Sequence, residues 1–260
     1  MNIQRVSYHT HTTISDGKLK PEELIKLAIK KKFKVLAITD HYTRPKGISL
    51  DDWGSNFYSD KDYEELLKLK EKYKNKIDLL IGTEFDWLPT KKEWLKDNVK
   101  KRDYDIKIIS VHMLYIKGEY YLFNANKELF SEILDLLGNN IKKLVKLYYK
   151  NLRKAIKTRL FDVVGHFDLI KIFNEDSRYF SDKDSWYKRE VVKTLRLMRK
   201  FNLKLDVNLA GFNHPVKEQY PSKWIIDIAK SMKINLLIGT DAHDKKELEY
   251  DLTTAQRLIE

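Results

Sequence analysis

Six of the seven histidines in this chain stand directly after short apolar runs, where a buried strand would end. Three acidic residues hold the same kind of position. The nine residues are His9, His11, Asp16, His41, Glu84, His112, His166, Asp241 and His243. Imidazole nitrogens and carboxylate oxygens are common protein ligands of divalent metals. If the strands are parallel and end at one rim, the nine groups could hold more than one metal ion.

Two pairs of these residues are spaced for joint coordination. His9 and His11 are two residues apart at a strand end, and Asp241 and His243 repeat that spacing. Side chains two apart point to the same side of an extended chain, so both members of a pair can reach one site. One His-x-His pair is weak evidence alone, but similarly placed groups in several other segments make chance agreement a poor explanation.

Ordinary structural roles compete with metal binding at some of these positions. Asp16 could be a turn carboxylate, His41 a buried core histidine and Glu84 part of a rim salt bridge. The metal interpretation is favoured because all of these groups occur together. Asp40 could orient the neighbouring His41 ring, and Asp168 fits a helix cap or an outer partner better than a metal ligand.

The donor types limit the cofactor. The chain has no cysteine, so every ligand must offer nitrogen or oxygen. Imidazoles mixed with carboxylates suit Zn, Mn or Fe, and we expect two to three divalent ions. Glu84 could bridge two of them, since a carboxylate has two oxygens. The donor set does not choose among the three metals.

Alternating strands and helices must position these groups. Strands are expected at 3–8, 35–39, 77–82, 105–111, 162–165, 203–209 and 234–239. Helices are expected from Pro21, at 62–74, at 127–158 with a break at 138–140, at 185–201 and from Pro221. Apolar strands followed by helices indicate a parallel sheet. Because candidate ligands follow nearly every strand, a distorted seven-stranded barrel fits better than an open sheet. Residues 1–260 are predicted to form one domain.

The composition is basic, with 50 Lys and Arg against 38 Asp and Glu and a formal net charge of +12. Such a charge could attract an anionic substrate or nucleic acid. Lysines spread along the sequence also fit solvated helix surfaces, which is the favoured interpretation. No run approaches the roughly 18 apolar residues of a membrane span, and the first residues lack a signal-peptide pattern. A cytoplasmic protein without membrane contact is expected.

The order of the motifs resembles the polymerase and histidinol phosphatase (PHP) superfamily over essentially the whole chain. The segments that carry the resemblance are His9-Thr10-His11, Ser15-Asp16-Gly17, Thr39-Asp40-His41, Gly82-Thr83-Glu84, Ser110-Val111-His112, Gly165-His166 and Thr240-Asp241-Ala242-His243. Residues 161–171 and 208–222 are similar to histidinol-phosphate phosphatases of the PHP type. The resemblance implies a distorted (β/α)7 TIM-like barrel with a trinuclear metal centre. It assigns one ion to His9, His11, Glu84 and Asp241, a second to Glu84, His112 and His166, and a third to Asp16, His41 and His243.

The resemblance also implies an activity, the hydrolysis of L-histidinol phosphate to L-histidinol and phosphate in histidine biosynthesis. The expected mechanism is in-line attack on phosphorus by hydroxide held by the metal centre. Glu84, Asp16 and His243 are the predicted catalytic groups. The expected partner is a small phosphorylated substrate, and we do not expect a nucleic acid partner. The sequence does not indicate an oligomeric state.

The sequence gives less information about the residues that contact the substrate than about the metal ligands. Phosphatases of this type tend to carry a basic pair where this chain has Asn213 and His214. Contacts are therefore expected from a scattered set, namely Lys171, Arg44, Asn208 and His214, with Arg178 as a further candidate for phosphate. Aromatic residues in loops after strands could wall a pocket or only pack at the rim. They are Tyr42, Trp53, Trp87, Tyr115 and Phe212.

Three other functions compete with this one. The first is a PHP phosphoesterase that acts on nucleotides or DNA ends. The second is an amidohydrolase, although many of those bridge their metals with a lysine on the fourth strand, where this chain has Ser110-Val111-His112. The third is a non-catalytic PHP module, which should have lost ligands; none of the nine is missing.

Overall fold

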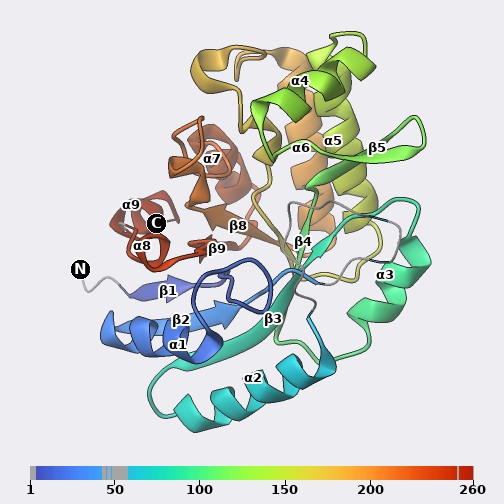
Figure 1. Ribbon diagram of the computed structural model, residues 1–260. Coiled ribbons are helices and arrows are strands. Elements are labelled where there is room, and N and C mark those ends of the chain that lie inside the picture. The colour runs from blue at the N-terminus through green and yellow to red at the C-terminus, as the bar shows by residue number, and fades with distance from the viewer. Residues whose placement is uncertain (1–3, 43–44, 46–47, 49–57, 251, 260) are drawn as a thin grey trace.

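Seven parallel strands form the centre of the computed structural model, which describes residues 4–42, 45, 48, 58–250 and 252–259 (Figure 1). In sheet order they are β1 (Arg5–Ser7), β2 (Phe33–Ile38), β3 (Asp78–Asp86), β4 (Ile106–Ser110), β7 (Val163–Val164), β8 (Lys204–Asn208) and β9 (Leu236–Gly239). The last strand returns to the first, because the Tyr8 N–H donates to the Ile238 carbonyl at 2.8 Å. The sheet is therefore a nearly closed barrel, and the predicted distorted (β/α)7 fold is confirmed.

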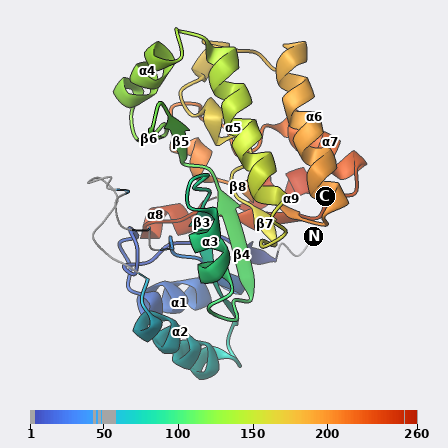
Figure 2. The ribbon, with the colours of Figure 1, turned by 90° about the vertical axis from the view of Figure 1, so that its right-hand side faces the viewer.

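Helices surround the barrel (Figures 1 and 2). They are α1 (Pro21–Lys30), α2 (Asp60–Tyr73), α3 (Lys92–Val99), α4 (Lys127–Leu136), α5 (Ile141–Ile156), α6 (Ser185–Lys200), α7 (Lys223–Ser231), α8 (Lys245–Leu248) and α9 (Leu252–Ile259). The predicted break at 138–140 separates α4 from α5. Gly138 has φ +73° there, and Asn140 caps α5 by accepting the Lys143 N–H at 3.0 Å. Among the described residues, none of these helices is long and apolar enough to span a membrane.

Some elements were not predicted. After β4 the chain forms an antiparallel hairpin of β5 (Met113–Ile116) and β6 (Glu119–Leu122). Its turn depends on Lys117 and Gly118, both with positive φ. Strands of four residues carry too little alternation to be recognised. The short helices α3, α8 and α9 were missed for a similar reason, since each has eight residues or fewer.

The core lies between the strands and their covering helices. Leu36 and Ile38 of β2 and Ile109 of β4 are fully buried, as expected for strands covered on both faces. Large aromatic side chains of α5 itself, Tyr148 and Tyr149, are also fully buried. This packing fixes the strand ends that carry the candidate ligands.

Candidate metal centre

The nine predicted ligands converge at one end of the barrel. Seven of them line a cavity of about 280 Å³, namely Asp16, His41, Glu84, His112, His166, Asp241 and His243. His9 and His11 are almost fully buried behind it. Their Nε2 atoms lie 3.4 Å and 3.0 Å from Asp241 Oδ1. The strand-end positions in the sequence therefore do bring these groups together.

Glu84 is at the centre of this arrangement. Its Oε1 lies 2.9 Å from His166 Nε2 and 3.7 Å from His112 Nε2. Its Oε2 lies 3.0 Å from His41 Nδ1 and 3.4 Å from His9 Nε2. The two oxygens thus face different imidazoles, which is the geometry that a carboxylate shared between two ions requires.

Three overlapping groups of side chains have ligand atoms within 4.8 Å of one another. They are His9, His11 and Asp241; His41, Glu84 and His112; and His11, Asp16, His41 and His243. The last group contains the whole of the expected third set. His11 and His41 each belong to two groups, so the boundaries between sets differ from those that the resemblance implies.

Unsatisfied buried nitrogens indicate that this donor set fits cations. His9 Nε2 and His11 Nδ1 are buried and have no hydrogen-bond partner among the described residues. Such atoms cost about 1–3 kcal/mol each when nothing compensates them. A divalent ion would accept these lone pairs, and imidazole with carboxylate is a donor set that such ions bind.

The electrostatics of the site also suit ligation. Burial would raise the pKa of Glu84, but the charges of His9 and His41 hold it well below its usual range. Burial lowers the pKa of His11 to about 3. Burial lowers the pKa of His243 as well, but its hydrogen bond to Asp16 and the nearby charge of Asp241 raise it to about 10. Glu84 is therefore ionised and His11 neutral at pH 7, whereas His243 must release a proton to bind a metal.

Two aspartates orient the ligands from outside. Asp206 Oδ2 lies 2.8 Å from His9 Nδ1, and Asp86 Oδ1 lies 2.6 Å from His112 Nδ1. Each carboxylate fixes the ring so that Nε2 faces the cluster. Neither residue was predicted from the sequence. The available signal was strand alternation, because Asp86 is two residues after Glu84 in β3 and so points to the same side.

Asp40 serves a different segment from the one expected. Its carboxylate accepts hydrogen bonds from the Thr12 N–H at 2.7 Å and from Ser15 Oγ at 2.7 Å. These bonds fix the loop that leads to Asp16. Asp40 therefore positions the candidate ligand Asp16 rather than the ring of His41.

Asp206→Asn tests the role of the outer carboxylates. The amide can donate a hydrogen bond to His9 Nδ1 and favour the wrong tautomer. We expect metal affinity to fall about 10–100-fold, measured by competition with a chromogenic chelator. Asp135→Asn, at an exposed position on α4, is the control. Unchanged affinity in Asp206→Asn would show that this contact does not orient the ligand.

The end of β9 is shaped by close backbone approach. A Cβ at Gly239 would lie 2.2 Å from Asp206 Oδ1 and 2.8 Å from the His9 Cβ, so only glycine fits there. Asp241 adopts φ +52°, a conformation that non-glycine residues rarely take. Its N–H donates to the His9 carbonyl at 2.8 Å. This bond fixes the strained turn so that the carboxylate faces His9 and His11.

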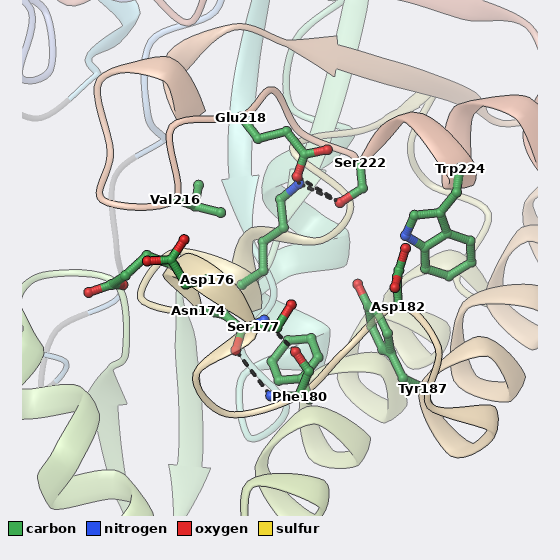
Figure 3. A pocket seen from close by; sticks show the side chains of 12 residues that line it. Asn174, Asp176, Ser177, Phe180, Asp182, Tyr187, Val216, Glu218, Ser222 and Trp224 are labelled. Atoms are coloured by element: carbon green, nitrogen blue, oxygen red, sulfur yellow. Dashed lines mark hydrogen bonds and ion pairs between the residues drawn. The ribbon is translucent and has the colours of Figure 1, made fainter.

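Some of the residues predicted to contact the substrate lie away from the metal cavity. Lys171 is 3% exposed, and its Nζ lies 2.7 Å from Glu218 and 2.6 Å from Ser222 Oγ. Glu218 and Ser222 face a separate cavity (Figure 3). Lys171 is thus engaged away from the metal groups. Arg44 lies outside the described residues. The Arg178 guanidinium lies over the Tyr179 ring, and Arg178 does not line the metal cavity.

Asn208 and His214 lie closer to the ligands. Asn208 Nδ2 donates to Asp206 and to Asp241, so Asn208 supports ligands rather than facing the cavity. His214 lines the cavity. Two polar lining residues were not predicted, Asn124 and Glu247. Glu247 accepts the His243 N–H at 2.7 Å from α8, a helix too short to be recognised.

The aromatic residues do not wall the cavity where they are described. Tyr42 and Trp87 are buried, and their polar atoms bond to Asn98 and Asn151. Tyr115 is 38% exposed on the hairpin, and Phe212 is partly buried against the core. None of these four lines the cavity; Trp53 lies outside the described residues. These four side chains therefore fit the alternative expectation, packing at the rim, and do not form a pocket wall.

Comparison with known proteins agrees with this geometry. The PHP domain model matches residues 7–210. The chain belongs to the PHP domain family. Among curated PHP relatives, a probable histidinol-phosphatase from Deinococcus radiodurans is 27% identical over 253 residues, covering 96% of this chain and 91% of that protein.

Two solved structures share the PHP fold. HisK from Listeria monocytogenes has a TM-score of 0.84 at 23% identity, covering 96% of this chain and 99% of the other. Histidinol phosphate phosphatase from Lactococcus lactis, complexed with zinc, L-histidinol and phosphate, has a TM-score of 0.71 at 20% identity. It covers 98% of this chain and 92% of the other. At these identities the likeness supports the fold.

Proposed function

We propose that this PHP protein is a metal-dependent phosphatase of a small phosphomonoester, with L-histidinol phosphate as its substrate. The convergence of nine imidazole and carboxylate groups at one end of the barrel, seven of them lining a cavity of about 280 Å³, carries the proposal. A cavity of that size favours a small molecule over a polymer. The name of the Deinococcus relative and the ligands of the Lactococcus structure support the choice of substrate.

Two to three divalent ions would be held by the three overlapping groups of ligands. When bound, such ions supply Lewis acidity, which neutralises phosphate charge and lowers the pKa of coordinated water. Glu84 contributes the shared carboxylate. Asp16 and His243 lie 3.4 Å apart at the cavity. His243 donates its Nδ1–H to the Asp241 carbonyl at 2.8 Å, which directs Nε2 toward Asp16. When only the other two groups hold ions, the Asp16–His243 pair is placed to hold a proton near the leaving group.

His214 offers a second proton at the cavity. Its Nδ1 lies 3.0 Å from the hydroxyl of Tyr220, which is fully buried. In the tautomer that we propose, the Tyr220 hydroxyl donates to Nδ1 and the ring carries its own proton on Nε2. Burial lowers the pKa of His214, which keeps the ring neutral at pH 7. His214 therefore presents an Nε2–H donor suited to a phosphate oxygen or the departing alkoxide.

His214→Ala should lower kcat/KM for the phosphomonoester by about 10–100-fold, the effect of losing one hydrogen bond to a charged group. Tyr220→Phe should give a smaller loss and shift the His214 tautomer, which 15N-detected NMR of the zinc-loaded protein can follow. Tyr121→Phe is the control, because that hydroxyl bonds to Glu119 on the hairpin and does not line the cavity. An unchanged kcat/KM in His214→Ala would remove this residue from the mechanism.

A substrate panel tests the proposed function. We expect kcat/KM for L-histidinol phosphate to exceed that for AMP, p-nitrophenyl phosphate and single-stranded DNA by at least about 100-fold. The expected preference equals about 2.7 kcal/mol of transition-state discrimination. A preference for the nucleotide or for DNA would instead favour the alternative PHP phosphoesterase. No hydrolysis of any phosphomonoester by the metal-loaded protein would reject both.

A further inference from the structure

The positive charge of this chain is concentrated on two helices. α5 carries six basic residues and no acidic one, and α6 carries six basic residues and one acidic residue, Glu190. Of the 50 basic and 38 acidic residues in the chain, the other elements therefore keep 38 and 37. The two helices thus account for almost all of the net charge of +12. Because lysines occur along the whole sequence, the concentration of net positive charge on these two helices was not predicted.

The two helices pack side by side on one flank of the barrel (Figure 2). A groove of about 590 Å³ lies on them. It is lined by five cations, Lys146 of α5 and Lys188, Arg189, Lys193 and Arg196 of α6. The groove also includes one acidic residue, Glu190, and two apolar ones, Val192 and Trp186; the Trp186 ring lies 5.9 Å from the Lys142 Nζ. We call this surface the α5–α6 face. None of its residues lines the metal cavity.

The cations of the α5–α6 groove have no carboxylate partner among the residues that the structure describes. Within the described part of the chain, none of the five makes an ion pair. The one acidic side chain, Glu190, is bound by Arg153 at 2.7 Å. Lysines on α1 and α2 differ, since Lys26 and Lys72 both pair with Glu22. Like charges spaced four apart along a helix, such as Lys142, Lys146 and Lys150, are mildly destabilising. Among the described residues, no ion pair to the five groove cations offsets that repulsion.

We propose that the α5–α6 face binds the phosphate backbone of a nucleic acid. The five groove cations could each meet one phosphate, and arginine matches phosphate geometry with two parallel hydrogen bonds. A helix of 16 residues is about 24 Å long, close to seven base pairs of duplex. A membrane surface fits less well, because surface-bound helices insert apolar side chains. The exposed large apolar residues among those described are Leu67 and Tyr115, and neither lies on these helices.

The test is fluorescence anisotropy of the zinc-loaded full chain with a labelled 24-base-pair duplex between 50 and 200 mM KCl. Contacts by five cations predict a slope of log affinity against log salt of about −4.5. The variant Lys193→Glu/Arg196→Glu should bind at least about 10-fold more weakly, with a slope shallower by about two. The control Lys61→Glu/Lys68→Glu changes exposed positions on α2 and alters the net charge by the same amount. It should bind within about twofold of the unmodified protein.

Several results would overturn the proposal. They are equal weakening by the two pairs of substitutions, absence of saturable duplex binding, and tighter binding to phosphatidylserine vesicles than to duplex. If the charge-reversal pair does not fold by circular dichroism, Lys193→Gln/Arg196→Gln against Lys61→Gln/Lys68→Gln makes the same comparison. Phosphomonoester hydrolysis should be the same in all these variants. The two proposals can therefore fail independently.

Discussion

Replacing Glu84 by Gln should reduce phosphomonoester hydrolysis by at least about 10³-fold, equivalent to about 4 kcal/mol of transition-state stabilisation. The amide keeps the size of the side chain but removes a negative charge and one ligand oxygen. Both oxygens of Glu84 face imidazoles, at 2.9 Å from His166 and 3.0 Å from His41. A single substitution therefore disturbs more than one group of ligands. Metal content per chain should fall together with the rate.

The fold should survive this substitution. Glu84 Oε1 also accepts a hydrogen bond from Ser110 Oγ, and the Gln amide oxygen can accept the same bond. Circular dichroism should be unchanged, and metal content can be measured by inductively coupled plasma mass spectrometry. Glu64→Gln, exposed on α2, is the matched control and should keep full activity. A rate within about 10-fold of the unmodified protein would show that Glu84 is not the shared ligand.

Removal of metal should have an effect of similar size. Dialysis against dipicolinate should lower the hydrolysis rate at least about 100-fold, and Zn, Mn or Fe(II) should restore it. The melting temperature should also fall, because an ion that binds only the folded state stabilises it by mass action. The physical cause lies in buried nitrogens such as His9 Nε2, which lose their partner when the ion leaves.

Full hydrolysis by protein that contains less than about 0.1 metal ion per chain would contradict this prediction and the metal-dependent mechanism behind it. A control incubation with the same chelator pre-saturated with zinc separates metal removal from inhibition by the chelator itself. Recovery with Mg alone would point to a harder, more oxygen-rich ligand set than the imidazoles provide.

The convergence of the candidate metal ligands was predictable because their signal is local. A parallel strand ends at the same rim as its neighbours, so a histidine after each apolar run must face that rim. His112 and His166 were found in this way, although β7 has only two residues. The outer partners Asp86 and Asp206 were less visible, because they lie inside strands and matter only through residues from other strands.

The role of Lys171 could not be predicted, because it depends on packing between distant segments. The sequence places this lysine just after His166, where a phosphate contact is reasonable. In the folded chain, the loop that carries Glu218 and Ser222 packs against Lys171. Both side chains hydrogen-bond the lysine ammonium group. The charge of the α5–α6 face is different, since counting acids and bases helix by helix would have revealed it.

The distribution of ligands around the rim implies an order in which the centre can assemble. His41, Glu84 and His112 form a complete group within the first half of the chain, whereas the other two groups need Asp241 or His243. Ribosomes extend chains at roughly 5–20 residues per second. A nascent chain could therefore retain a first ion several seconds before the remaining donors emerge. The later ions would then act as a latch, since Asp241 and His243 follow β9 and join the strand that closes the barrel against β1.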